Sequence, residues 1–197
     1  MKRLYFDTET TGFPRKTETP LEECPHIVQL AALLIDDDLG EIGCFNAIIR
    51  PDGWVISEEV AAIHGITTEK AIACGIPINV AMAVFTQLAY NAAQVIAHNI
   101  TFDLQLVDYE FRRIDRKNVL AEMAKACTME GSVDVVRIPP TPAMLRAGRH
   151  NFKSPKLIES YQHFFGEEFD GQHDALADVR ACARIHRHLI KLESPKP

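Results

Sequence analysis

The chain has 197 residues, of which 47% are hydrophobic and 24% are charged, and its formal net charge is −6. This composition is globular, which excludes a disordered or membrane-embedded chain, and the acidic balance excludes a uniformly basic nucleic-acid binder. The length fits one domain over residues 1–192 followed by a C-terminal tail over 193–197. We expect neither a signal peptide nor a transmembrane span, because charge at Asp7 interrupts the first apolar run.

The chain has five cysteines, which are scattered and include no Cys-x-x-Cys pair. An odd, unpatterned set argues against a disulfide framework and against structural zinc. We therefore predict a cytoplasmic protein, since free thiols persist in a reducing compartment.

The first half of the chain predicts three strands and then helices. Leu4–Asp7 is rich in residues that favour strands, and Ile27–Ile35 and Glu41–Arg50 flank a short acidic turn, which is typical of an antiparallel hairpin. Short helices are expected from Ser57 to His64 and from Thr67 or Thr68 to Ala73, and a longer one from Pro77 to about Asn91.

The second half predicts two more strands between helices. The short apolar segment Gln94–Ala97 indicates a buried strand, after which Thr101 can cap a helix over Phe102–Ile114. Ala126–Met129 is a further strand candidate. Residues 130–154 carry a weak signal, with β-like valines and an extended Pro139–Pro142 segment.

Two final helices are expected, over Pro155–Phe165 and from an Asp174 cap to about Leu192. The order of elements predicts an α/β fold, with a mixed sheet that contains one antiparallel hairpin.

Two acidic residues come at the end of the first strand. Asp7 and Glu9 are two positions apart, so on a strand they point to the same face. Gly12 and Pro14 then end the strand. Carboxylates that converge in this way repel each other unless a cation lies between them, and Mg²⁺ or Mn²⁺ prefers such oxygen ligands.

Three further residues, from the middle and the C-terminal part of the sequence, can complete this site. Asp103 lies near the start of a helix that follows a strand, and Asp178 lies in the first turns of the last helix among small residues. A buried aspartate facing a sheet is costly unless it is paired or metal-bound. His173 lies in the loop before that helix, where an imidazole can accept a proton from water.

These motifs resemble those of the DEDDh 3′→5′ exonucleases, a family that includes the proofreading epsilon subunit of bacterial DNA polymerase III, ribonuclease T and oligoribonuclease. The matching segments are Phe6–Gly12, His98–Asp103 and His173–Asp178. The resemblance runs from about Leu4 to about Ile190 and implies a ribonuclease H-like fold. That fold has a mixed five-stranded sheet in the order 3-2-1-4-5, flanked by helices.

The resemblance also implies a two-metal-ion site that hydrolyses the terminal phosphodiester bond. Asp7, Glu9, Asp103 and Asp178 would hold two divalent ions, Mg²⁺ or Mn²⁺, with Asp7 bridging them, and His173 would be the general base. By the same resemblance, the substrate-binding residues would be Thr10, Thr11, Gly12, His64, Ile66, Asn99 and Phe102. His64 and Phe102 can equally serve as a helix end and a core residue, and Asn99 can simply satisfy loop backbone groups.

Basic residues gather in two places despite the acidic total. One group follows the Asp103 helix, and the other falls in or beside the weakly patterned segment: Arg112, Arg113, Arg116 and Lys117, and Arg137, Arg146, Arg149, His150, Lys153 and Lys156. Either group can follow the phosphates of a bound strand, or be ordinary solvated surface.

We therefore expect a metal-dependent 3′→5′ exonuclease that releases nucleoside 5′-monophosphates from single-stranded or frayed ends. DNA is the first choice of substrate, because Phe6–Gly12 is closest to proofreading-type members, and a separate polymerase subunit is a candidate partner. The alternative enzyme is a ribonuclease T-like or oligoribonuclease-like exoribonuclease, in which case a dimer is expected. A non-catalytic nucleic-acid- or polymerase-binding module, or an acidic structural domain, would also fit the fold alone.

Overall fold

A computed structural model describes residues 1–193 and has a five-stranded sheet at its centre. The strands are β1 (Lys2–Thr10), β2 (Ile27–Asp36), β3 (Gly40–Ile48), β4 (Gln94–Ala97) and β5 (Ala124–Cys127). Their order is β3-β2-β1-β4-β5, with β1, β2 and β3 antiparallel and β4 and β5 parallel to β1. This confirms the expected 3-2-1-4-5 sheet with its hairpin.

Eight α-helices and one short 3₁₀ helix accompany the sheet within the described residues. They are η1 (Leu21–Glu23), α1 (Glu58–His64), α2 (Thr68–Cys74), α3 (Ile78–Tyr90), α4 (Ile100–Arg113), α5 (Thr128–Val136), α6 (Pro142–Arg146), α7 (Leu157–Phe165) and α8 (Ala175–Glu193). Ser57 and Thr67 cap α1 and α2 through their hydroxyls, as their sequences predict. No helix within residues 1–193 is long and apolar enough to span a membrane.

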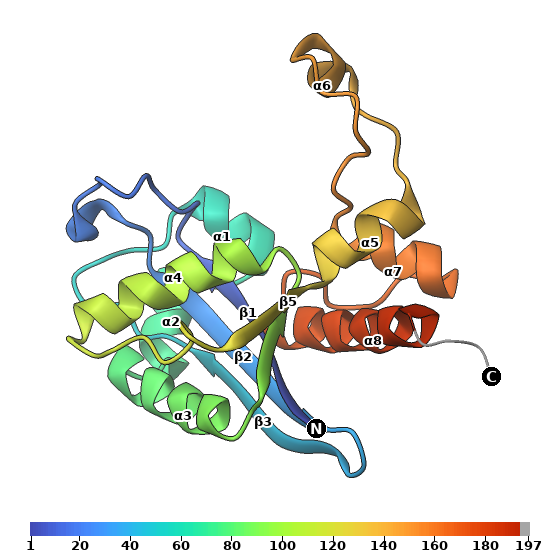
Figure 1. Cartoon of the computed structure of the whole chain (residues 1–197). Helices are drawn as coiled ribbons and strands as arrows, with labels where there is room; N and C mark the ends of the chain where they lie inside the picture. The colour runs from blue at the N-terminus through green and yellow to red at the C-terminus, as the bar shows by residue number, and fades with distance from the viewer. Residues whose placement is uncertain (194–197) are drawn as a thin grey trace.

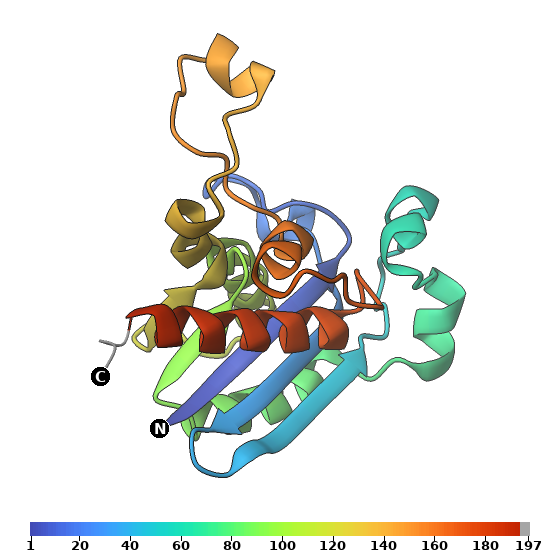
Figure 2. The ribbon, with the colours of Figure 1, turned by 90° about the vertical axis from the view of Figure 1, so that its right-hand side faces the viewer.

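The alternation of side chains along β1 divides the core into two layers. Leu4 and Phe6 are fully buried against α3 and α4, whereas Tyr5 on the other face packs with α8. Figure 2 shows α8 crossing that second face of the sheet, and α5 and α7 pack on α8 (Figure 1). Asp7 and Glu9 share the parity of Tyr5, so the sequence of β1 directs both carboxylates toward the N-terminal end of α8.

Three expectations about the second half of the chain are wrong in detail. The strand expected over Ala126–Met129 is Ala124–Cys127, and Thr128 and Met129 already belong to α5. Helix α4 begins at Ile100 after Asn99, whose backbone is left-handed with φ 65°, so Thr101 lies inside the helix and is not its cap. The valines of residues 133–136 form part of α5 and not an extended segment. That helix packs against α7 and α8, and this burial outweighs the weak strand preference of its valines.

Residues 138–152, here called the arm, project from the sheet and helices that form the body of the molecule (Figures 1 and 2). The arm leaves the end of α5, carries the short helix α6 and returns to α7. The extended Pro139–Pro142 segment stops at Pro142, which is the first residue of α6 behind a Thr141 cap. The tail expected over 193–197 falls outside the described residues, apart from the last residue of α8.

Candidate active site

The carboxylates predicted from the sequence come together at the carboxyl end of β1. Glu9, His173 and Asp178 each offer a ligand atom, and these atoms lie within 4.8 Å of one another. Asp7 is close enough to Asp103, Asp178 and Glu9 for their charges to act on its titration. The arrangement joins β1 with α4 and the start of α8, three elements far apart in the sequence.

Asp103 is the most buried member of the cluster, with 2% of its surface exposed. It comes from α4, on the opposite face of the sheet from α8, and is fixed by Thr8 of β1. The Thr8 backbone N–H donates to Asp103 Oδ1 over 3.0 Å and the Thr8 hydroxyl donates to the same atom over 2.9 Å. The other carboxylate oxygen therefore remains available for a ligand.

His173 and Asp178 are held together by the turn that begins α8. His173 is exposed and has a left-handed backbone with φ 65°, and its N–H donates to Asp178 Oδ2 over 3.2 Å. Asp174 caps the helix, as predicted, since its Oδ1 accepts from the N–H groups of Leu176 and Ala177. The imidazole is thus presented in solvent beside the carboxylates.

Mutual repulsion and burial raise the pKa values of all four carboxyl groups. The pKa of Asp7 lies well above its usual range, because of burial first and then the charges of Asp103, Asp178 and Glu9. Burial and its acidic neighbours raise the pKa of Glu9 to about 8. Burial also raises the pKa of Asp103 to about 7, against the lowering effect of the Thr8 hydrogen bonds.

Asp178 follows the same trend, since burial raises its pKa to about 7. Such a cluster is strained without a counter-charge. Four convergent carboxylates and one imidazole are a donor set that suits hard divalent cations, so the residues present fit the expected metal ions.

The structure also shows participants that the sequence did not reveal. Asp174 contributes its charge to the titration of Asp7 and Glu9, and its Oδ2 accepts from Gln29 Nε2 over 2.9 Å. The buried Gln29 also accepts from the Ala175 N–H, so one side chain of β2 fixes the beginning of α8. These pairs are about 145 positions apart in the chain, and no local pattern could have indicated them.

The segment after β1 folds back toward the start of β2. The Thr10 hydroxyl donates to the Gly12 carbonyl over 2.8 Å, and Thr11 exchanges hydrogen bonds with the backbone of His26. An added Cβ at Gly12 would meet nothing within 4 Å, which leaves open space beside this turn. Thr10, Thr11 and Gly12 thus border the cluster from the chain segment that immediately follows Glu9.

His64 reaches the cluster from α1. It is buried, its Nδ1 accepts from the Ile66 N–H over 3.1 Å, and its Nε2 has no partner among the described residues. Burial lowers its pKa, and the nearby His173 lowers it further. His64 therefore offers one unpaired ring nitrogen close to His173.

The other residues predicted to bind substrate have different surroundings. Ile66 is 3% exposed and packs in a small core with Val28, Ile56 and Ala71. Asn99 is exposed at the start of α4. Phe102 is half-buried, and its ring meets that of Phe13 edge-on with centroids 6.1 Å apart. Phe13 is 83% exposed, and sequence reasoning did not single it out.

Solved structures of similar fold include E. coli exonuclease I. Its complex with a 5cy-dT13 oligonucleotide matches with a TM-score of 0.71 and 22% identity, over 98% of this chain and 41% of that one. Its dA16 complex gives 0.71 and 21%, over 98% and 41%. Its zinc-bound complex with single-stranded DNA gives 0.69 and 20%, over 99% and 41%. This chain thus spans about two fifths of those proteins, and at such identities the likeness shows the ribonuclease H-like fold alone.

A comparison of the sequence with curated proteins finds no match. The family comparison is decisive, because the exonuclease model RNase_T matches residues 4–186, nearly the whole chain. That span includes every carboxylate of the cluster and His173. The chain therefore belongs to the RNase_T family of exonucleases, within the DEDDh superfamily.

Proposed function

We propose that this protein is a metal-dependent 3′→5′ exonuclease that releases nucleoside 5′-monophosphates from single-stranded or frayed DNA ends. The observation that carries the proposal is the convergence of Asp7, Glu9, Asp103 and Asp178 with His173 at the carboxyl end of β1. Membership of an exonuclease family supports it. All four carboxylates and the histidine are present, which disfavours a non-catalytic module or an acidic structural domain.

In this proposal Asp7, Glu9, Asp103 and Asp178 would hold two divalent ions, and Asp7 would be a ligand of both. When bound, such ions supply a nucleophilic water and stabilise the charge on the leaving 3′ oxygen. Thr8 keeps the Asp103 carboxylate oriented through its two hydrogen bonds. Since burial, and then repulsion between the carboxylates, raises these pKa values, a bound cation would favour the charged form of the carboxyl groups.

His173 is proposed as the general base. A ring nitrogen takes the proton of the attacking water as its oxygen bonds to phosphorus and the 3′ oxygen leaves. The exposed position of His173 lets the ring pass that proton on to solvent. Asp174 and Gln29 hold the turn on which the ring is presented.

The proposed pocket for the last nucleotide lies between the β1 end and α1. Thr10, Thr11 and Gly12 form one side, and the unpaired Nε2 of His64 lies on the other. Phe102 and Asn99 border the start of α4. The core position of Ile66 suggests that it supports His64 more than it touches the substrate.

DNA is proposed over RNA because Phe6–Gly12 most resembles proofreading-type members. The matched exonuclease I structures hold dT13 and dA16 oligonucleotides, which agrees with that choice. A cytoplasmic location and a separate polymerase partner stay predictions.

The test is a matched time course on 5′-labelled single-stranded DNA and RNA of one sequence, with Mg²⁺, with Mn²⁺ and with chelator. We expect a ladder that shortens from the 3′ end on DNA and stops in chelator. A ladder on RNA alone would favour the ribonuclease T-like alternative, and no degradation of either would favour a binding module. An Asp7→Ala preparation purified in parallel excludes a contaminating nuclease.

A further inference from the structure

The arm differs from the rest of the molecule in its charge. No acidic residue lies between Asp134 and Glu159, a stretch that includes the arm. The same stretch holds five of the 21 Lys and Arg residues of the chain. These five cations are Arg137, Arg146, Arg149, Lys153 and Lys156. A cationic segment on an acidic protein marks a surface for a polyanion.

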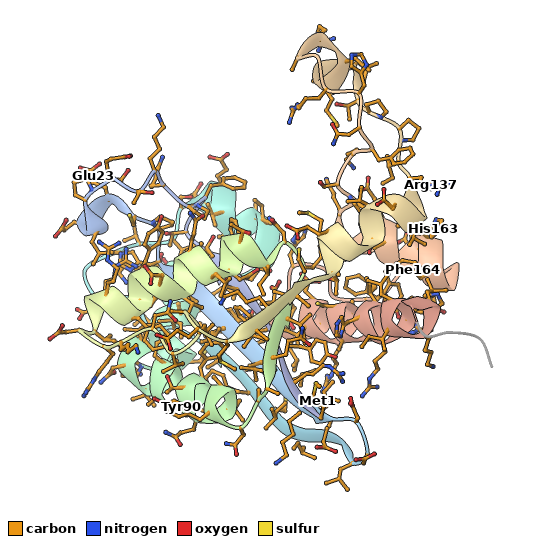
Figure 3. All side chains as sticks on the ribbon, viewed as in Figure 1. Met1, Glu23, Tyr90, Arg137, His163 and Phe164 are labelled. Carbon is orange, nitrogen blue, oxygen red and sulfur yellow. The ribbon has the colours of Figure 1, made fainter. Side chains whose placement is uncertain are left out.

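The cations at the end of the arm are free to bind a ligand. Arg146 and Arg149 are exposed, and within residues 1–193 neither side chain has an ion pair or a hydrogen bond. By contrast, Arg113 on α4 donates to Glu110 and to three backbone carbonyls. Figure 3 shows the side chains of the arm spread into open space beyond Arg137, which marks its base.

The base of the arm is fixed to the body. The Lys153 N–H donates to the Ile138 carbonyl over 2.9 Å and closes the arm where its two ends meet. Lys153 Nζ bonds both carboxylate oxygens of Glu159 on α7, at 2.5 and 2.6 Å. The base of the arm is therefore fixed to the body, while Arg146 and Arg149 at its far end are exposed to solvent.

Contacts of His98 with residues on either side of the arm connect its base with the candidate active site. His98 bonds the Thr128 hydroxyl through Nδ1 at 2.9 Å and the Pro155 carbonyl through Nε2 at 3.0 Å. His98 lies two residues before Ile100, the first residue of α4, which carries Asp103. Figures 1 and 2 show that the arm and α1 rise at the same end of the molecule, beyond the carboxyl end of β1.

The arm also has the composition of a single-strand contact. Three prolines, at positions 139, 140 and 142, restrict its backbone and limit the entropy lost on binding. Phe152 is 37% exposed and Leu145 is 45% exposed, so an aromatic ring and an apolar side chain accompany the cations. Cations interspersed with aromatic side chains are the usual means of holding a flexible strand without sequence preference.

We propose that the arm binds the phosphate backbone of the substrate strand upstream of the 3′ nucleotide, through Arg146 and Arg149. This inference rests on the proposed function and extends it, because it assigns the enzyme a second contact that only a long strand can reach. It predicts that longer strands bind more tightly and that this gain depends on salt.

The experiment compares wild type with Arg146→Gln/Arg149→Gln on a 3′-terminal trinucleotide and on a strand of about 15 nucleotides. We expect the ratio of kcat/KM for the long strand to that for the short one to fall roughly tenfold in the variant. Binding of the long strand in chelator, followed by fluorescence anisotropy, should show a slope of log K against log salt that is shallower by about 1.4, since each phosphate that the variant no longer neutralises accounts for about 0.7.

The matched control is Arg187→Gln/Lys191→Gln in the C-terminal half of α8, which removes the same charge away from the arm. This control should keep the wild-type length ratio and salt slope. An unchanged ratio and slope in the arm variant, or equal decreases in the control, would overturn the proposal. Because anisotropy in chelator needs no turnover, an inactive wild type would refute the proposed function while the role of the arm could still be measured.

Discussion

The carboxylate cluster and the arm are built on opposite principles. The cluster draws on β1, α4 and α8. Thr8 and the His173 backbone donate hydrogen bonds to its carboxylates, and Gln29 holds the neighbouring Asp174 at the start of α8. The arm is one continuous segment whose anchors lie at its base, with Arg146 and Arg149 free. Chemistry needs groups held within fractions of an ångström, whereas attraction to a flexible polyanion does not. Changes in the cluster should therefore act on kcat, and changes in the arm on strand affinity.

The largest expected effect comes from removing the central carboxylate. Asp7→Ala should lower turnover by roughly 10³-fold or more, because the cluster acts as a unit. The same change removes a repelling charge, so the melting temperature in chelator should be equal to or above that of wild type. Asp38→Ala, in the exposed turn between β2 and β3, is the control. Wild-type cleavage by Asp7→Ala would refute the metal site.

The next largest effect is expected from removing the proposed general base. His173→Ala should lower kcat by about 10² to 10⁴-fold, the usual contribution of a general base, while metal binding persists. The pH–rate profile should change shape in this variant. His163→Ala, on the surface of α7, should leave rate and profile unchanged. A profile in His173→Ala identical to that of wild type would remove His173 from the mechanism.

A smaller effect should follow from loosening a support of the cluster. Thr8→Val removes one of the two hydrogen bonds to Asp103 and keeps the side-chain volume, and we expect roughly a 10- to 100-fold loss of activity or of metal affinity. The readout is kcat as a function of Mg²⁺ concentration. If Thr8→Val behaved as wild type at every Mg²⁺ concentration, the backbone bond alone would suffice to orient Asp103.

The cluster should also impose a pH dependence on stability that the arm does not. The folded protein raises the pKa of Glu9 to about 8 and those of Asp103 and Asp178 to about 7. At any pH between the usual pKa of a group and its raised pKa, that group takes up a proton on folding. In chelator, the contribution of these three groups to the free energy of unfolding should therefore fall as pH rises from about 4, where the unfolded carboxyl groups ionise, to about 8.

Buried histidines act in the opposite direction at lower pH. Burial lowers the pKa of His26 and of His98 to about 4, so their contribution to stability is lost as pH falls from 6.5 toward 4. Saturating Mg²⁺ should abolish the contribution of the carboxyl groups and leave that of the histidines unchanged. Melting curves across pH, with and without Mg²⁺, measure both contributions. If stability changed between pH 6.5 and 8 in the same way with and without Mg²⁺, the cluster would not be the cause.

The smallest effect is expected for the arm itself. Replacing residues 140–151 with two glycines should change the unfolding free energy by less than about 1 kcal/mol, because exposed segments whose ends already meet tolerate shortening. Denaturant unfolding measures it. A large decrease would mean that the arm supports the body, so that the arm and the cluster would no longer be energetically independent.

Much of the fold was predictable from the sequence, because most elements carry their own local signal. The predicted bounds of the strand Gln94–Ala97 are those of β4. Helix α1 begins after Ser57 and ends before Gly65, as expected. Helix α5 was not predictable, since its valines favour strands and only its packing on α7 and α8 makes it helical. The direction of the arm was equally hidden, because proline-rich sequence specifies stiffness but not orientation.

The candidate site, like the fold, was predictable from the sequence only in part. The convergence of Asp7 and Glu9 follows from strand periodicity, and their meeting with Asp103 and Asp178 was predicted from the resemblance and is seen in the structure. The bridge from Gln29 to Asp174 and Ala175 could not be foreseen, since it joins β2 to the start of α8 through one buried amide. Exposed Phe13 was missed because an aromatic residue in a loop carries no pattern.

The distribution of the cluster along the chain has a consequence for biosynthesis. Asp7 leaves the ribosome well before His173 and Asp178, which belong to α8 and the turn before it. We therefore expect a nascent chain to lack nuclease activity until α8 has emerged and has docked on the sheet. A ribosome translating this protein would be shielded, by the order of synthesis alone, from an enzyme able to attack nucleic acid.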